Sequence, residues 1–220
     1  MKPARPVVTR APHRRVGYIP CPWLQDHPVA YESLLECRFV YIALLYPSLR
    51  EIFHQPFHVE LGELGKYTPD YLLRCASHDD IVVEVKPRKF VSKHADKLQA
   101  AKVAIERRGL RFLVCTEHEI AANGRDERAS VILRHARSHL SRDLVESLLV
   151  RQRGLSFPMS VSALAECLGT TRDRIHYLIG RRELHLAPSL SDTRVFNSTD
   201  KKGDHDGDFS ARAWFGGANW

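Results

Sequence analysis

Three residues that could share one chemical task lie on two neighbouring apolar segments of the chain. Asp70 follows a proline on the first segment, and Glu84 and Lys86 belong to the second, 81–86. The polar stretch 76–80 between the segments is typical of a turn. If the two segments pair as a hairpin, Asp70 and Glu84 are equally far from its centre. The two carboxylates then lie opposite each other, or nearly so, on adjacent strands, about 5 Å apart.

The spacing of these residues predicts hydrolysis of a phosphodiester. Lys86 comes two residues after Glu84 and therefore points to the same face of its strand. Carboxylate oxygens hold Mg²⁺, which polarises the phosphate and activates water, while a lysine can orient or deprotonate that water. An accidental spacing is the alternative, because 27% of the chain is charged. The apolar neighbours of Glu84 favour the site, since buried charges are rare unless they are paired or bound to metal.

The elements around these residues predict a mixed α/β arrangement. The stretch 30–45 has apolar residues at helical spacing and carries Glu32 and Glu36 on one face, where a solvated surface is the alternative interpretation. A strand-like run at 52–60 follows and turns back into the Asp70 segment. A helix predicted over 92–108 then returns a strand, 111–115, parallel to the one that carries Glu84.

These motifs together resemble a known family of nucleases. Their arrangement is similar to the restriction-endonuclease-like PD-(D/E)XK fold and, more narrowly, to TnsA, the endonuclease subunit of heteromeric bacterial transposases. The resemblance covers roughly residues 10 to 120. The matching pieces, in chain order, are Glu32-Ser-Leu-Leu-Glu36, Gln55-Pro56, Tyr67-Thr-Pro-Asp70, Glu84-Val-Lys-Pro87, Lys97-Leu-Gln-Ala-Ala-Lys102 and Thr116-Glu-His-Glu-Ile120.

The resemblance implies a mixed sheet flanked by helices and Mg²⁺-dependent cleavage at the 5′ ends of a mobile element. Its partners would be double-stranded DNA at the transposon ends, an RNase-H-like transposase subunit (TnsB-like) that cuts and joins the 3′ ends, and an AAA+ ATPase regulator (TnsC-like). In that family a helix Glu, a hairpin Asp and a strand Lys form the active site. They map to Glu36, Asp70 and Lys86, and Glu36 is preferred to Glu32 because it matches a Ser-x-x-Glu pattern. The expected ligands of one or two Mg²⁺ ions are the carboxylates of Glu36, Asp70 and Glu84 and the carbonyl of Val85.

Basic residues are concentrated where a nucleic acid would have to lie. The net charge is +7 and the pI is about 9.3, and a cluster of lysines and arginines begins directly after Lys86. Such side chains hold a phosphate backbone in place, although a solvated helix face is the alternative. The residues expected to contact DNA here are Arg88, Lys89, Lys93 and Lys97.

The chain beyond residue 120 predicts a second, helical unit. A turn-rich joint at 122–126 precedes a long amphipathic helix over 127–151. Two short helices over 159–169 and 170–180 then resemble a helix-turn-helix, and two short strands could form the wing of a winged-helix domain, a fold type that the TnsA family also carries. Protein contact alone is the alternative to DNA contact for this unit. Its candidate DNA-binding residues are Arg172, Arg174, Arg181 and Arg182.

The predicted organisation is therefore a basic N-terminal arm (1–25), a nuclease domain (26–121), a winged-helix-like domain (126–196) and a disordered tail (197–220). The tail carries Trp214, Phe215 and Trp220, which predict either a segment that orders on binding the ATPase or an accidental coding sequence. A deletion of residues 200–220 would decide between them by its effect on ATPase binding.

We expect neither a signal peptide nor a membrane span, because the N-terminal residues include charges but no apolar run, and no apolar run approaches 18 residues. Five scattered cysteines without a C-x-x-C pair indicate reduced thiols, so we expect a cytoplasmic bacterial protein that acts at the nucleoid. No zinc site is expected: His54 and His58 sit in a strand-like run and should face solvent or pack at the sheet edge.

Two other functions fit the same residues. A stand-alone nuclease of this fold, for repair, restriction or junction resolution, would cut DNA without a partner. A non-catalytic DNA-binding regulator would bind DNA without Mg²⁺ and cut nothing. The intact set of Glu, Asp and Glu-x-Lys argues against the regulator, since a pure binder has no need to place carboxylates near phosphate.

Overall fold

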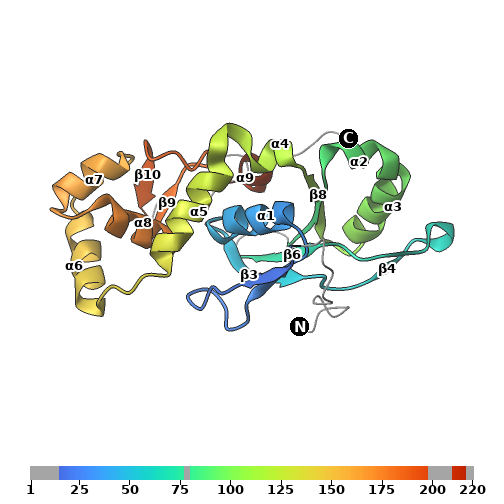
Figure 1. The fold of residues 1–220 in the computed structure, drawn as a ribbon, viewed down its shortest axis with the longest axis horizontal. Coiled ribbons are helices and arrows are strands. Elements are labelled where there is room, and N and C mark those ends of the chain that lie inside the picture. Colours follow the sequence, from blue (N-terminus) through green and yellow to red (C-terminus); the bar gives the residue numbers. More distant parts are fainter. Residues whose placement is uncertain (1–14, 77–79, 198–209, 217–220) are drawn as a thin grey trace. The chain divides into compact units, whose positions relative to one another are not determined.

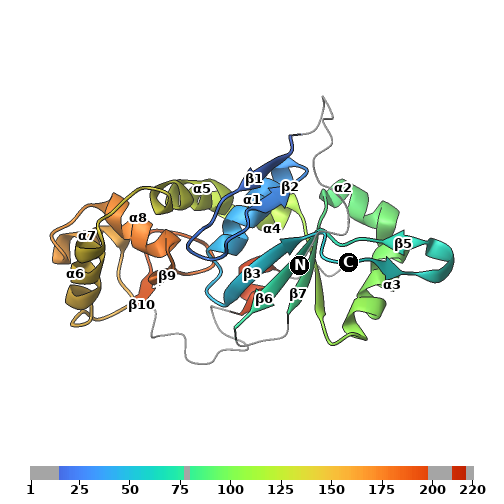
Figure 2. The same ribbon diagram turned by 90° about the horizontal axis from the view of Figure 1, so that it is seen from below.

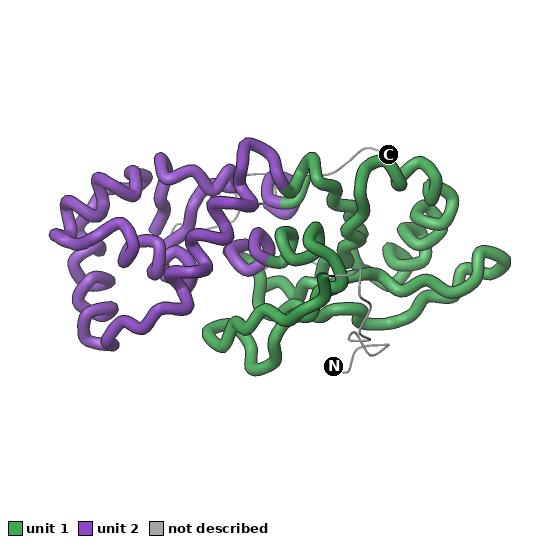
Figure 3. The backbone as a smooth tube through the Cα atoms, viewed as in Figure 1, with its two compact units in different colours: residues 1–40, 48–120, 215–220 green, residues 41–47, 121–214 purple. Residues whose placement is uncertain are grey.

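The structure is a computed structural model that describes residues 15–76, 80–197 and 210–216. The chain divides into two compact units, which Figure 3 shows in different colours. The first unit comprises the chain up to Val40, Ser48–Ile120 and the end of the chain from Phe215. The second comprises Tyr41–Pro47 and Ala121–Trp214. No helix in the described residues is both long enough and apolar enough to cross a membrane.

A four-stranded mixed sheet forms the centre of the first unit (Figures 1 and 2). Its strands, in spatial order, are β3 (Leu49–His54), β6 (Tyr71–Cys75), β7 (Ile81–Val85) and β8 (Arg111–Cys115). The first three are antiparallel neighbours, and β8 runs parallel to β7, as the sequence predicts. Every residue of β7 is buried, which is why it is an almost continuous apolar run.

Helices flank this sheet. The described helices of the first unit are the first turns of α1 (Leu34–Leu44), then α2 (Arg88–Val91), η2 (Ser92–His94), α3 (Ala95–Glu106) and α4 (Glu117–Ile120). The single helix expected over 92–108 is thus shorter, and two short helical turns precede it. Helix α3 buries Leu98, Ala101 and Ile105 in the same core as Val82 of β7. This packing holds β7 and β8 side by side.

Two small antiparallel ribbons complete the first unit: β1 (Gly17–Ile19) with β2 (Val29–Tyr31), and β4 (Val59–Glu60) with β5 (Lys66–Tyr67), the latter pair joined by η1 (Gly62–Leu64). The N-terminal arm predicted for residues 1–25 is wrong for its second half. Ile19 and Cys21 are buried, and the Gln25 amide bonds both the N–H and the carbonyl of Ile52. These side chains are apolar or fully paired, so they join the fold. Residues 1–14 lie outside the described part of the chain.

The second unit is mainly helical, with η3 (Ala122–Gly124), α5 (Arg125–Ala136), α6 (Arg142–Gln152), α7 (Val161–Cys167), α8 (Arg172–Gly180) and an antiparallel pair, β9 (Leu184–Leu186) with β10 (Val195–Asn197). The single helix predicted over 127–151 is wrong. The chain breaks at 137–141, and Ser141 caps α6 by accepting from the Leu144 N–H. Gly180 lets α8 approach α5 closely, because a Cβ there would lie 2.6 Å from the Cβ of Ala136.

The C-terminal segment departs most from its prediction. A disordered tail is expected from residue 197, yet Ala211–Phe215 form helix α9 and Trp214 is fully buried. In the second unit the Trp214 indole donates to the carbonyl of Ile42 at 3.2 Å, and its ring lies 5.6 Å from that of Tyr46. Trp214 and Phe215, two of the aromatic residues in the predicted tail, are therefore buried residues. Residues 198–209 and Trp220, also assigned to the tail, lie outside the described residues.

Candidate active site

The hairpin of β6 and β7 brings the predicted carboxylates together. Tyr71 pairs with Val83, and continuing this register by one residue puts Asp70 opposite Glu84, as the sequence predicts. Both residues line one cleft of about 640 Å³ in the first unit. The cleft is also lined by Arg15, Glu32, Ser33, Leu34, Leu35, Glu36, Val85, Lys86 and Pro87. All four predicted catalytic side chains therefore face the same space.

Glu84 is a buried carboxylate whose two oxygens are both engaged. Oε2 accepts from the Tyr67 hydroxyl at 2.7 Å, and Oε1 lies 2.8 Å from the Lys86 ammonium. Glu84 is only 5% exposed, so the lysine compensates a charge that would otherwise be costly to bury. The pair places Lys86 at the edge of the carboxylate cluster.

The environment of Asp70 disfavours the charged form of its carboxyl group. Burial, followed by the nearby charges of Glu84 and Glu36, raises the pKa of Asp70 well above its usual range. The Val85 N–H, which donates to its Oδ2 at 2.8 Å, and the Lys86 charge act in the opposite direction but do not cancel the increase. A cluster of this kind gains free energy from a bound cation, which removes the repulsion between the carboxylates.

The proline before Asp70 changes the backbone hydrogen bonding beside the site. Gln55 donates its N–H to the Asp70 carbonyl, so the backbone of Asp70 faces β3 and its alternate neighbours face β7. Continuing the β6–β7 register places Pro69 opposite Val85. Proline has no N–H, so it gives the Val85 carbonyl no partner in the ladder. This carbonyl is thereby available at the cleft as an oxygen ligand.

Glu36 lies in the first turn of helix α1 and forms a reciprocal cap with Ser33. Its N–H donates to the Ser33 hydroxyl, which in turn donates to Glu36 Oε1, and Glu36 Oε2 accepts from the Glu32 N–H. Burial on its own would raise the pKa of Glu36, but the nearby His54 imidazole and the Glu32 and Ser33 donors lower it below the usual value. The Ser-x-x-Glu pattern therefore has a structural role that keeps the carboxylate charged beside Asp70.

His54 is the site-adjacent residue that sequence reasoning missed. It is expected at solvent or at the sheet edge, but it is buried at the end of β3, with its Nε2 3.7 Å from Glu36 Oε2. Its ring packs edge-on against Tyr71, 5.3 Å away. The alternation of buried Ile52 and His54 along β3 is the signal that could have placed it on the inner face.

Residues 47–117 match the family model described as TnsA-like endonuclease N terminal. Over this range the chain is similar to the TnsA-like endonucleases. The match extends from just before β3 to the first residue of α4, and it contains Asp70, Glu84 and Lys86 but not Glu36. It confirms the predicted family resemblance. Among curated proteins, none matches this chain.

A second cleft of about 270 Å³ adjoins the carboxylate cleft of the TnsA-like domain. It shares Glu84 and Lys86 with the first cleft, and its other lining residues are Lys66, Tyr67, Thr68, His94, Lys97 and Leu98. Of the predicted DNA-binding residues, Lys97 lines this cleft, whereas Arg88, Lys89 and Lys93 are exposed on α2 and η2. Sequence reasoning missed Lys66, because β5 is remote from α3 in sequence.

The predicted arginines of the second unit have contacts of their own within that unit. Arg172 pairs with Asp192, and Arg174 contacts the Thr170 hydroxyl at 3.4 Å. The Arg181 guanidinium lies 5.1 Å from the centre of the Tyr177 ring, and Arg182 donates to the Pro47 carbonyl. Arg172 keeps 56% of its side chain exposed, and the other three arginines are half-buried.

Proposed function

We propose that this chain is the Mg²⁺-dependent endonuclease subunit of a heteromeric transposase, which cleaves the 5′ ends of a transposon during cut-and-paste transposition. The observation that carries the proposal is the convergence of Asp70, Glu84 and Lys86 on one cleft inside the TnsA-like segment. The donor set suits the ion, because Mg²⁺ prefers carboxylate and carbonyl oxygens. The raised pKa of Asp70 supports the proposal, since it results from burial and from the nearby charges of Glu84 and Glu36.

Asp70 and Glu84 would hold one or two Mg²⁺ ions together with the Val85 carbonyl. When bound, Mg²⁺ supplies Lewis-acid polarisation of the scissile phosphate and lowers the pKa of a coordinated water. Glu36 completes the carboxylate set. Its Oε1 accepts only from the Ser33 hydroxyl among the described contacts, and so has a lone pair left for the ion or its water.

Lys86 would position the attacking water. Its ammonium is held by Glu84 at 2.8 Å, which fixes the side chain at the point where carboxylates and phosphate must meet. A positive charge there also stabilises the extra negative charge that develops on the phosphate in the transition state. The lysine would thus both orient the attacking water and stabilise the negative charge on the phosphate.

The basic second cleft would hold a phosphate next to the scissile one. Lys66, Lys97 and His94 line it together with the Thr68 hydroxyl, and it is continuous with Glu84 and Lys86. Phosphate contacts of this kind position the duplex without reading its sequence. Arg88, Lys89 and Lys93 would extend the contact along the backbone, and Arg172, Arg174, Arg181 and Arg182 of the winged-helix-like second unit would add further contacts.

Base recognition and the 3′ reactions would come from partners: an RNase-H-like transposase subunit (TnsB-like) and an AAA+ regulator (TnsC-like). A subunit that works only in this assembly should cleave almost no DNA on its own. A stand-alone nuclease would cleave DNA without a partner, and a regulator would bind DNA without cleaving it.

The deciding experiment is cleavage of a DNA that carries the element ends, with Mg²⁺, for wild type and Asp70→Ala, with and without the cognate transposase. Asp96→Ala is the matched control, because Asp96 is an exposed aspartate on α3. Cleavage at the 5′ ends only with the partner, lost in Asp70→Ala and kept in Asp96→Ala, supports the proposal. Cleavage by the protein alone favours the stand-alone nuclease, and DNA binding without cleavage favours the regulator.

A further inference from the structure

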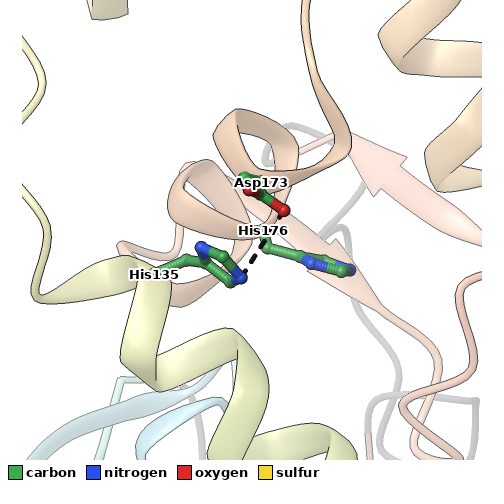
Figure 4. A group of neighbouring side chains, drawn as sticks. All are labelled: His135, Asp173 and His176. Atoms are coloured by element: carbon green, nitrogen blue, oxygen red, sulfur yellow. Dashed lines mark ion pairs between the residues drawn. The ribbon is translucent and has the colours of Figure 1, made fainter.

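The second unit contains a cluster of metal-ligating side chains that lies outside the nuclease cleft. His135 projects from α5, and Asp173 and His176 project from the first turns of α8 (Figure 4). One ligand atom of each residue lies within 4.8 Å of those of the other two. Helices α5 and α8 pack against each other, so the cluster bridges two elements of one compact unit.

We propose that His135, Asp173 and His176 form a binding site for a divalent transition-metal ion of the Zn²⁺ type, which ties α8 to α5. Two imidazoles and one carboxylate favour such an ion over Mg²⁺ or Ca²⁺, which prefer all-oxygen surroundings. Three protein ligands with an open fourth position suit a tetrahedral ion. The proposal does not depend on the nuclease function.

His176 is the observation that points to a ligand. Its Nε2 lies 3.0 Å from Asp192 Oδ1, and Asp192 is also paired with Arg172, so this carboxylate is the hydrogen-bond acceptor and Nε2 carries the proton. The neutral imidazole then has its lone pair on Nδ1. That atom is buried and has no hydrogen-bond partner among the described residues. A carboxylate that orients a histidine through its other nitrogen is the usual outer-sphere support of a metal-ligating imidazole.

The contacts of Asp192 support this tautomer. Its Oδ1 faces Nε2 of His176, and its Oδ2 accepts from Arg172. Asp192 therefore accepts from both residues, and His176 presents the lone pair of Nδ1. His176 is only 8% exposed, so without a bound ion this nitrogen is a buried acceptor with no partner among the described residues, which is unfavourable.

The distances need only small side-chain movements. Ligand atoms of a tetrahedral Zn²⁺ lie about 3.3–3.5 Å apart, given metal–ligand distances of about 2.0–2.1 Å. His135 Nε2 and Asp173 Oδ1 are already 3.6 Å apart. The Asp173 side chain is 72% exposed and that of His135 is 25% exposed, so both can rotate toward the fixed His176. The buried His176 is thus the fixed ligand of the cluster. His135 and Asp173 are more exposed and can adjust their side chains.

The test uses untagged full-length protein in the Asp70→Asn background, so that the nuclease cleft is weakened as a competing metal site. Zn²⁺ affinity is measured by competition with a chromophoric chelator, and Co²⁺ is used for its visible absorption. We expect one equivalent of Zn²⁺ and a Co²⁺ band of tetrahedral type. His135→Ala and Asp173→Asn should each reduce the affinity at least about tenfold, and Asp192→Asn about tenfold to a hundredfold.

The matched controls are His139→Ala and Asp143→Asn. His139 is an exposed histidine shortly after His135, and Asp143 is an exposed aspartate in the first turn of α6, as Asp173 is in α8. Both should bind as tightly as the parent protein. Circular dichroism without metal shows whether the variants fold, and His135 is preferred to the buried His176 for this reason. No stoichiometric binding by the parent, or unchanged binding by folded His135→Ala, would overturn the proposal.

Discussion

The carboxylate cleft of the first unit and the histidine cluster of the second unit are built in opposite ways. Asp70, Glu84 and Lys86 come from one hairpin, and their order along the chain already defines their geometry. His135 and His176 come from two helices that α6 and α7 separate in sequence. A site inside a single hairpin can be recognised from spacing, whereas a site between two packed helices exists only once the helices meet.

The two clusters also differ in how their charge is compensated. In the first unit, burial and the nearby carboxylates of Glu84 and Glu36 raise the pKa of Asp70, and the single ammonium of Lys86 does not offset them, so a cation is favoured. In the second unit Arg172 and His176 both pair with Asp192. The atom of the cluster that has no hydrogen-bond partner among the described residues is Nδ1 of His176. The first arrangement suits a hard cation and the second a softer one.

The largest effect is expected for Lys86→Ala, which would show that the cleft is catalytic and not merely a charged surface. Removal of a group that positions water or a proton costs about 100- to 10,000-fold in rate. We expect such a loss in single-turnover cleavage with Mg²⁺ and the partner transposase, with the fold retained by circular dichroism. As the control, Lys102→Ala should cut at nearly the wild-type rate, because Lys102 lies on α3 and lines neither of the two clefts. An active Lys86→Ala would remove this residue from the mechanism.

Trp214→Ala tests whether the second unit depends on the C-terminal segment. Removing a fully buried large aromatic side chain costs about 3–5 kcal/mol of unfolding free energy. A urea titration should show this loss. Val150→Ala is the comparison, because Val150 is 60% exposed on α6 and should change the stability little. If both variants unfold at the wild-type denaturant concentration, the burial of Trp214 does not stabilise the unit.

Asp70→Asn should stabilise the protein in the absence of metal. The folded-state pKa of Asp70 is raised, so its contribution to stability is present at low pH and is lost as the pH rises through that value. The variant should therefore equal wild type near pH 4 and exceed it at neutral pH, by about 2–4 °C in Tm for each kcal/mol relieved. Thermal unfolding in a chelator across this pH range checks the trend, and added Mg²⁺ should raise the Tm of wild type more than that of the variant. A variant less stable than wild type at neutral pH would contradict the raised pKa.

The smallest effect is expected for Lys97→Ala, which separates phosphate positioning from catalysis. DNA affinity should fall by a similar factor for unrelated sequences, and the slope of log affinity against log salt should decrease by about one. Lys102→Ala serves as the control, because Lys102 lies on the same helix outside the residues that line the basic cleft. A loss confined to one DNA sequence would argue for base reading instead.

Local patterns were sufficient for much of the first unit. The apolar run of β7, the polar stretch before it and the carboxylates on either side of the turn predict the hairpin, its register and the cleft. The helix before β8 and the parallel pairing of β7 and β8 also follow from the sequence. The register is well specified because a slip by one residue would turn Glu84 and its buried neighbours to the opposite face.

Patterns failed where distant contacts outweigh local composition. The stretch around Trp214 has the polarity and glycine content of a disordered tail. In the second unit, however, its indole packs against Tyr46 and donates a hydrogen bond to the Ile42 carbonyl. The sequence predicts a surface position for His54, but its ring packs against Tyr71 and lies close to Glu36. The predicted long helix breaks at 137–141 because Ser141 begins a new helix, a cap that competes with continued helical periodicity.

The amino-acid sequence by itself determined the hairpin with its carboxylates, the order of strands in the mixed sheet and the TnsA-like character of residues 47–117. These features depend on residues that are near one another in the chain, so periodicity and turn chemistry are enough to predict them. Only the tertiary structure decided which polar groups lost their water. It buried His54 and Trp214, and it brought ligand atoms of His135, Asp173 and His176 within 4.8 Å of one another. Whether a side chain is buried, and whether a buried polar group lacks a hydrogen-bond partner, depends on packing between segments that are distant in the sequence. Local sequence patterns therefore do not predict it.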